Sequence, residues 1–223
     1  MSVISFEGVQ GSSKTTAAVA LAYEEHKNNG RRVISNDHLN FDYTHFDIKY
    51  FLEHIADGEL EDCIILLDEM YQIADSRSSQ TNLNKLVTYF AVQTRKRGVD
   101  LYLCTHHLDH IDLRLRRAVD IRGACRFYSE SPCKKCKCRR CGGKGCDECN
   151  QVGGTGEYLE QPCDRCLGYG VTGWSVVHFL DRRLRQRYTM EIFGPRYWHL
   201  FSTRERLPIQ AKMVQGIDVL EVV

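Results

Sequence analysis

The chain has 223 residues, of which 43% are hydrophobic, so it can bury one full core and carry at most a small additional module. Its formal net charge of +1 indicates no class of partner, because only local clusters of charge are then informative. The first residues lack a basic segment before a long apolar run, and no stretch reaches the roughly 18 apolar residues of a membrane span. We therefore expect a cytoplasmic protein that does not contact a membrane.

Strand patterns recur along the chain. Short apolar runs typical of buried strands occur at 2–8, 31–36, 63–69, 99–105 and 123–128. Two further runs, at 174–181 and 188–194, are expected to be antiparallel strands around the basic turn 182–187.

Helix patterns lie between these strands. Apolar residues recur at helical spacing over 14–28, 47–56 and 82–96, and Gly30 and Gly98 follow the first and last of these segments. In the second segment, Phe51, Leu52 and Ile55 are expected on one face. The alternation of strands and helices predicts an α/β fold, with a mostly parallel sheet and helices on both of its faces.

The composition changes at Ser131. Residues 131–173 are rich in Cys, Gly and Lys and contain few aliphatic residues. We expect them to form a small module inserted between neighbouring strands of a main domain made of residues 1–130 and 174–223.

The segment GVQGSSKTT, residues 8–16, is close to the phosphate-binding pattern GxxxxGK[ST]. Gly8, Lys14 and Thr15 match the pattern, and the turn between strand and helix offers backbone N–H groups to a phosphate. Gly11 and Ser12 are small and Thr16 continues the helix, but Ser13 replaces the last glycine. The segment is thus a working nucleotide site, a weakened one, or an ordinary turn made of small residues.

Two acidic residues, Asp68 and Glu69, end the apolar strand at 63–69. Ligands of α/β sheets bind at the carboxyl ends of strands, where an aspartate can hold Mg²⁺ and a neighbouring glutamate can activate a water molecule. A solvated strand end is the simpler explanation. The position of this pair after a phosphate-loop pattern nevertheless favours ATP-dependent chemistry.

The strand at 99–105 also ends in polar residues. Thr105 is the candidate for sensing the γ-phosphate, with His106 as the second candidate. The histidines at 106, 107 and 110 could form a metal site, but no fourth ligand is evident, and solvated loop histidines are the preferred interpretation.

Six arginines flank this strand, and phosphoryl transfer needs a cation that a neighbouring subunit often supplies. They are Arg95, Arg97, Arg114, Arg116, Arg117 and Arg122. We take Arg97 and Arg117 as the candidates for this role in an oligomeric ring. Contact with a nucleic-acid backbone, or plain solvation, is an equally good explanation for any single arginine.

Eight of the eleven cysteines lie in four CxxC pairs between Cys133 and Cys166, whereas Cys63, Cys104 and Cys125 are expected in the core. Two CxxC turns complete one tetrahedral zinc site, so eight thiolates predict two structural Zn²⁺ ions. Between Cys133 and Gly145 there are six Lys or Arg and no acidic residue, which suits contact with nucleic acid. A solvated or protein-docking basic arm is the alternative.

Two of the cysteine segments, CRRCGGKG and CDRCLGYG, resemble the zinc domain of DnaJ-type chaperones. In that family the outer pairs share one ion and the inner pairs share the other. The resemblance implies one site made by Cys133, Cys136, Cys163 and Cys166. It implies a second site made by Cys138, Cys141, Cys146 and Cys149.

The phosphate loop together with IILLDE, RKRGVDLYLCTHH, IDLRLRRAVD and GPRYWHLFSTRE resembles viral P-loop ATPases of the zonular occludens toxin-like and FtsK–HerA type, which grade into terminase-like ATPases. The resemblance covers residues 1–130 and about 174–206. It implies an ASCE/RecA-like fold in which Lys14 and Thr15 bind phosphate and Mg²⁺, Asp68 holds Mg²⁺, Glu69 activates water and Thr105 senses hydrolysis. It also implies a ring that moves double-stranded DNA, with viral portal or capsid proteins as partners in the host cytoplasm.

The sequence therefore predicts an ATP-hydrolysing motor for DNA translocation or viral genome packaging. A small-molecule P-loop kinase is one alternative, although a kinase does not need a water-activating residue at Glu69. The other alternative is a non-catalytic zinc-binding nucleic-acid adaptor whose nucleotide site has decayed through Ser13.

Overall fold

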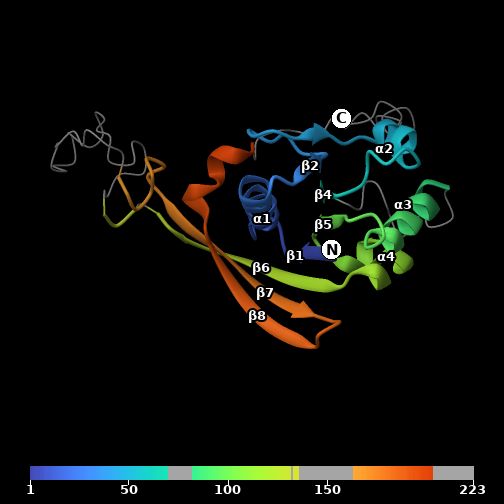
Figure 1. The fold of residues 1–223 in the computed structure, drawn as a ribbon. Coiled ribbons are helices and arrows are strands. Elements are labelled where there is room, and N and C mark those ends of the chain that lie inside the picture. Colours follow the sequence, from blue (N-terminus) through green and yellow to red (C-terminus); the bar gives the residue numbers. More distant parts are fainter. Residues whose placement is uncertain (70–81, 132, 136–162, 203–223) are drawn as a thin grey trace, which may run out of the picture.

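The computed structural model describes residues 1–69, 82–131, 133–135 and 163–202, and it contains one eight-stranded sheet (Figure 1). The strands are β1 Val3–Glu7, β2 Arg32–Ser35, β3 Thr44–His45, β4 Cys63–Leu67, β5 Asp100–Thr105, β6 Ile121–Glu130, β7 Thr172–Asp181 and β8 Gln186–Phe193. Their order across the sheet is β3-β2-β4-β5-β1-β6-β7-β8. The first six strands of this order pair in parallel, and β7 and β8 join antiparallel at one edge.

Among the described residues, four α-helices lie on the two faces of the sheet, which confirms the predicted fold class. They are α1 Lys14–Asn29, α2 Ile48–His54, α3 Asn82–Gln93 and α4 Leu113–Ala118. Short 3₁₀ turns also occur, at η3 Leu108–His110 before α4 and at η4 Gly194–Arg196 and η5 Trp198–Leu200 after β8.

The alternating side chains of β4 show how the two faces are used. All five residues of β4 are buried. Ile64 and Leu66 pack in the hydrophobic cluster that contains the alanines of α1. Cys63 and Ile65 pack in a second cluster, which contains Phe51 of α2 and the buried side chains of α3 and α4. Because successive strand residues point to opposite faces, an uninterrupted apolar run is what a strand covered on both sides requires.

Two expectations about the helices are partly wrong. The helix predicted over 47–56 is shorter, and Leu52 is 49% exposed, although Phe51 is buried as predicted. The helix predicted over 82–96 ends at Gln93, and a turn leads from there to Gly98, which has a left-handed φ of 74°. The first end was predicted too late because Ile55 and Ala56 continue the apolar spacing after the helix stops. The second was predicted too late because no glycine or proline marks a stop before Gly98.

The hairpin of β6 and β7 carries the cysteine-rich segment at its far end. Ile121 pairs with Asp181 and Glu130 pairs with Thr172, so the chain leaves β6 and returns to β7 at adjacent positions. The basic turn after Asp181 then leads to β8, which pairs antiparallel with β7 as expected. Over the described residues, no helix combines the length and the hydrophobicity that crossing a membrane would require.

Candidate nucleotide site and cysteine cluster

The carboxyl ends of β1, β4 and β5 meet at one edge of the sheet. Glu7 of β1 lies beside Thr105 of β5, and Leu67 of β4 lies beside Leu103 of β5. The loop after β1 therefore approaches the acidic residues after β4, and α1 begins beside them at Lys14. A helix N-terminus with a preceding glycine-rich turn is an anion-binding arrangement.

The loop requires glycine at its first position. Gly8 has a φ of 153°, and a Cβ atom there would lie 2.5 Å from Oγ of Ser12 and 2.9 Å from the carbonyl oxygen of Cys125. Gly11 has a φ of 76°, but a Cβ atom there would meet no heavy atom of the described residues within 4 Å. The turn is closed by a hydrogen bond of 3.1 Å from the N–H of Ser12 to the carbonyl oxygen of Val9.

Ser13 adopts the backbone conformation that explains why the pattern has glycine here. It is the N-cap of α1, with φ 63° and ψ 34° in the left-handed region. A residue with a Cβ atom reaches this region at a cost of about 1–2 kcal/mol. The Ser13 hydroxyl donates a hydrogen bond of 2.6 Å to the carbonyl oxygen of Ser12. The serine is thus accommodated at an energetic cost, and its hydroxyl is engaged with its own backbone.

Lys14 is held within the loop. Its side chain is buried, and Nζ donates hydrogen bonds of 3.0 Å to the carbonyl oxygen of Gly8 and 3.1 Å to that of Val9. Both acceptors are neutral, whereas a phosphate would offer a charged acceptor and a stronger hydrogen bond. The ammonium group is therefore available to a phosphate bound by the loop.

A hydrogen bond of 2.6 Å connects the hydroxyl of Thr15 to Oδ2 of Asp68. Burial raises the pKa of Asp68, while hydrogen bonds from the Thr15 hydroxyl and the N–H of Glu69 act in the opposite direction. A hydroxyl and a carboxylate in direct contact are oxygen ligands of the kind that Mg²⁺ prefers. These two residues fit the metal of a metal–nucleotide complex.

Asn36 holds the backbone of Asp68 in place, a role that the sequence analysis missed. The N–H of Asp68 donates to Oδ1 of Asn36 at 2.8 Å, and Nδ2 of Asn36 donates to the carbonyl oxygen of Asp68 at 2.9 Å. Asn36 follows β2, which pairs directly with β4. The signal in the sequence was a polar residue at the end of the predicted strand 31–36.

Glu69 also has a left-handed φ, of 50°. Its Oε1 atom lies 3.6 Å from Nε2 of His106, whereas its Oε2 atom is buried without a hydrogen-bond partner among the described residues. Thr105 is buried, and its hydroxyl donates to the carbonyl oxygen of His107 at 3.2 Å. Of the two predicted sensor residues, His106 is thus the one in contact with Glu69.

A family model for ATPases associated with various cellular activities (AAA) matches residues 4–126. The chain belongs to the AAA ATPase family. The matched range runs from β1 into β6 and contains the loop, Asp68, Glu69 and Thr105. The predicted enzyme class, an ATPase with a P-loop fold, is therefore confirmed.

Solved structures share this AAA ATPase fold. The N-terminal domain of zonular occludens toxin from Neisseria meningitidis matches with a TM-score of 0.55 at 15% identity, over 90% of this chain and 98% of that one. The genome packaging NTPase B204 from Sulfolobus turreted icosahedral virus 2, in complex with AMP, matches with a TM-score of 0.50 at 11% identity, over 84% and 96%. At these identities the likeness concerns the fold alone. No curated protein sequence matches the chain.

Five of the six arginines form ion pairs within this AAA domain: Arg95 with Asp120, Arg97 with Glu61, Arg114 with Asp112, Arg116 with Asp109 and Arg122 with Glu7. The Arg97 side chain is only 19% exposed and also lies over the ring of Phe90 at 5.4 Å. Glu61 precedes β4, so Arg97 lies at the edge of the sheet opposite to Asp68. Arg117 is exposed on α4, and no described residue forms an ion pair with it.

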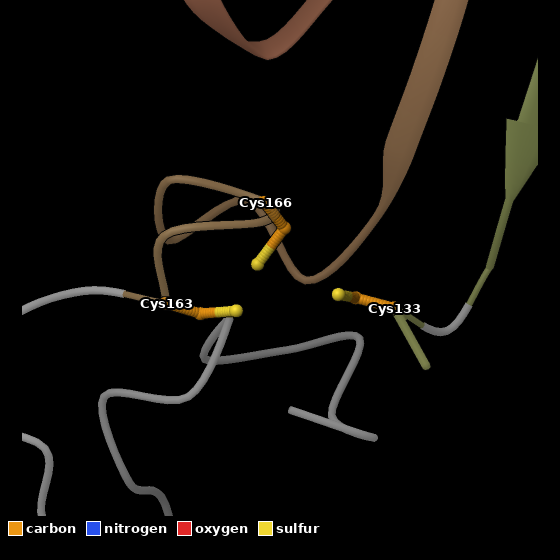
Figure 2. A group of neighbouring side chains, drawn as sticks. All are labelled: Cys133, Cys163 and Cys166. Atoms are coloured by element: carbon orange, nitrogen blue, oxygen red, sulfur yellow. The ribbon is translucent and has the colours of Figure 1, made fainter. Parts of the chain in front are cut away.

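Three cysteine thiols converge at the end of the β6–β7 hairpin (Figure 2). Cys133, Cys163 and Cys166 are buried, and their Sγ atoms lie within 4.8 Å of one another. Burial opposes ionisation of Cys163, but hydrogen bonds from the N–H groups of Cys166 and Arg165 and from neighbouring thiols lower its pKa below the usual value. Such a set of thiols suits a zinc ion and contains three members of the first site that the DnaJ resemblance implies.

The remaining predicted metal ligands lie outside the described residues. They are Cys136, Cys138, Cys141, Cys146 and Cys149. The first metal site therefore has three of its four predicted ligands placed together, and the second site stays a prediction.

Replacing Ser13 with glycine is expected to stabilise the protein. The substitution removes the cost of the left-handed conformation but gives the unfolded chain more freedom, so we expect a net gain of about 1 kcal/mol, equivalent to roughly 2–4 °C in Tm. Thermal unfolding measures it. In the control, Ser12→Gly, the backbone is not left-handed, so the change should destabilise by about 0.5–1 kcal/mol. A lower Tm for S13G than for the unmodified chain would contradict this account.

Replacing Cys163 with serine is expected to lower the zinc content by about one ion per chain, because a hydroxyl is a poor substitute for a thiolate ligand. Elemental analysis by mass spectrometry measures the zinc-to-protein ratio. Cys63→Ala is the matched control, since Cys63 is a buried thiol at the start of β4 and should leave the ratio unchanged. An equal zinc content in both variants would remove the cysteine cluster as a metal site.

Proposed function

We propose that this AAA ATPase is a motor that moves double-stranded DNA as a homo-oligomeric ring, in the manner of viral genome packaging. The observation that carries the proposal is the contact between Thr15 and Asp68, followed directly by Glu69. Two oxygen ligands suited to Mg²⁺ would then lie next to a carboxylate suited to activating water, and hydrolysis requires both. The fold shared with a protein described as a genome packaging NTPase supports the same use of this arrangement.

The residues of the site divide the reaction between them. Lys14 and the N–H groups of the loop from Gly8 to Thr16 bind the phosphates. Thr15 and Asp68 would hold Mg²⁺, which would neutralise charge on the phosphates. Glu69 accepts a proton from the attacking water, and its Oε2 atom has no hydrogen-bond partner among the described residues that would compete. His106 positions Glu69 through the contact at Oε1.

Asp68 and Glu69 also favour the motor over the two alternatives, a small-molecule kinase and a non-catalytic adaptor. A kinase transfers phosphate to a bound hydroxyl, and a water-activating carboxylate next to its metal ligand would favour wasteful hydrolysis. A decayed nucleotide site would have no reason to retain the half-buried, hydrogen-bonded Asp68. The additional partners of the motor would be portal or capsid proteins, and the basic cysteine-rich segment is a candidate contact for them or for DNA.

Replacing Glu69 with glutamine is expected to abolish turnover, by about 100-fold or more, while ATP still binds, because the amide cannot accept the proton from water. Steady-state ATPase assays and calorimetric titration with ATP measure the two properties separately. Glu61→Gln, an exposed acid at the opposite edge of the sheet, is the control and should retain turnover. Unchanged turnover in E69Q would overturn the proposed mechanism, and failure of the unmodified chain to bind ATP would favour the adaptor.

The proposed ring would use Arg117 of one subunit at the nucleotide site of the next. Arg117→Ala and Lys14→Ala should each be inactive alone, but a mixture should recover ATPase activity. In mixed rings, a site with Lys14 from the first variant can receive Arg117 from the second. ATPase activity at a fixed total protein concentration is measured after the subunits are mixed under exchange conditions. In the control, a mixture of Arg97→Ala with Lys14→Ala should be no more active than the more active of the two variants alone. Arg117 would be excluded from this role if the mixture of R117A with K14A were no more active than either variant alone.

A further inference from the structure

The three strands β6, β7 and β8 expose one face, which we call the outer face. On β6 it carries Arg122, Ala124, Arg126 and Tyr128, all of which are exposed and alternate with the inward-facing Cys125. The opposite face is buried by α1 and by the chain around η5: Cys125, Val177, Phe179 and Leu200 belong to the same hydrophobic cluster as the α1 alanines. Figure 1 shows these strands extending beyond the part of the sheet that α3 and α4 cover.

The register of the strands defines rows across the outer face. Arg122 lies beside Leu180, which lies beside Arg187. Four residues along β6, Arg126 lies beside Val176, and Val176 lies beside Glu191. On β7, the residues directly beside Arg126 and Arg187 are therefore apolar. A carboxylate at either position would have neutralised the neighbouring arginine.

The outer face has an excess of positive charge. Arg122 is neutralised by Glu7, with contacts of 3.0 and 2.9 Å. For Arg126 and Arg187, no acidic partner exists within the described part of the chain. The turn 182–185 at the end of the outer face adds three more arginines, of which Arg183 lies 3.9 Å from the carboxylate of Asp120. The exposed Glu191 lies on the same face, beside Val176, but Arg126, Arg187 and the arginines of the turn outnumber it, and this excess of positive charge indicates an anionic partner.

We propose that the outer face binds double-stranded DNA, with Arg126 and Arg187 contacting backbone phosphates. The inference rests on the proposed function and names the surface that holds the DNA. The aromatic residues favour a duplex over a single strand. They are confined to one end row, Tyr128, Trp174 and Phe193, whereas the row between the two arginines holds Ala124, His178 and Thr189. Single-strand binding needs aromatic side chains along the groove for successive bases to stack on.

The outer face is also connected to the nucleotide site. β6 pairs directly with β1, and Glu7, the partner of Arg122, immediately precedes Gly8 of the phosphate loop. Bound DNA would therefore lie one strand away from the loop. The position is suitable for a motor, because DNA contact and ATP hydrolysis then occur on adjacent strands.

The double variant Arg126→Ala/Arg187→Ala tests the inference in the full-length protein. Each phosphate contact contributes about 0.9 to the slope of log K against log salt for B-DNA, so the slope should become shallower by about 1.8. Fluorescence anisotropy with a labelled duplex at several salt concentrations measures it. The control Lys49→Ala/Lys96→Ala makes the same change in net charge at exposed positions on other elements, and should leave the slope unchanged. ATPase activity without DNA should be the same in both variants, which shows that the nucleotide site is intact.

Three outcomes would overturn the inference. The first is a slope for R126A/R187A equal to that of the control. The second is a loss of oligomer mass by light scattering in R126A/R187A alone, which would make the outer face a subunit interface. The third is tighter binding to a single strand of equal length than to the duplex.

The failure of this inference can be distinguished from that of the proposed function. If DNA stimulates the ATPase but the two variants have equal slopes, the motor stands and the surface is wrong. If R126A/R187A has the shallower slope but DNA never affects the ATPase, the surface stands and the motor is wrong.

Discussion

The hydrogen bond between Thr15 and Asp68 joins residues that follow two strands, β1 and β4, which do not pair with each other. Thr15 follows β1 and Asp68 follows β4, and β5 lies between these strands in the sheet. The contact forms only because all three strands run in the same direction and end at the same edge. The parallel order of the strands is therefore the constraint on which nucleotide chemistry in this protein depends.

This edge of the sheet is maintained against several local costs. Ser13 and Glu69 both have left-handed φ values, and Asp68 is a half-buried carboxyl group whose pKa is raised by desolvation. Such conformations persist where the surrounding structure determines them, and they gather at functional sites. Here the surroundings are the fully buried β4 and the paired hydrogen bonds of Asn36 with the backbone of Asp68. The stability of the surrounding fold thus offsets the local cost of holding these groups in position for the reaction.

The sequence predicted the features that local pattern determines. The loop, Asp68 with Glu69, and helices on both faces follow from glycine and apolar spacing. Features that depend on distant contacts were missed or misjudged: the role of Asn36, the exposure of Leu52, and the ion pair that buries Arg97. An arginine in a motif has the same appearance whether a nearby acid neutralises it or not. Only the folded structure shows that five of the six candidate arginines form ion pairs, whereas Arg117 forms none with the described residues.

The net charge of +1 conceals an uneven distribution of charge. Residues 37–62, around β3 and α2, contain eight acids and one lysine. Residues 182–187, the turn after β7 and the start of β8, contain four arginines and no acid. These segments lie toward opposite edges of the sheet, because β3 and β8 are its two edge strands. Under the proposed function, a duplex would be repelled by the first edge and attracted to the second, which would restrict how it approaches one subunit. In a ring, the same charge asymmetry would give every subunit the same orientation relative to the DNA. Movement in one direction requires such a common orientation.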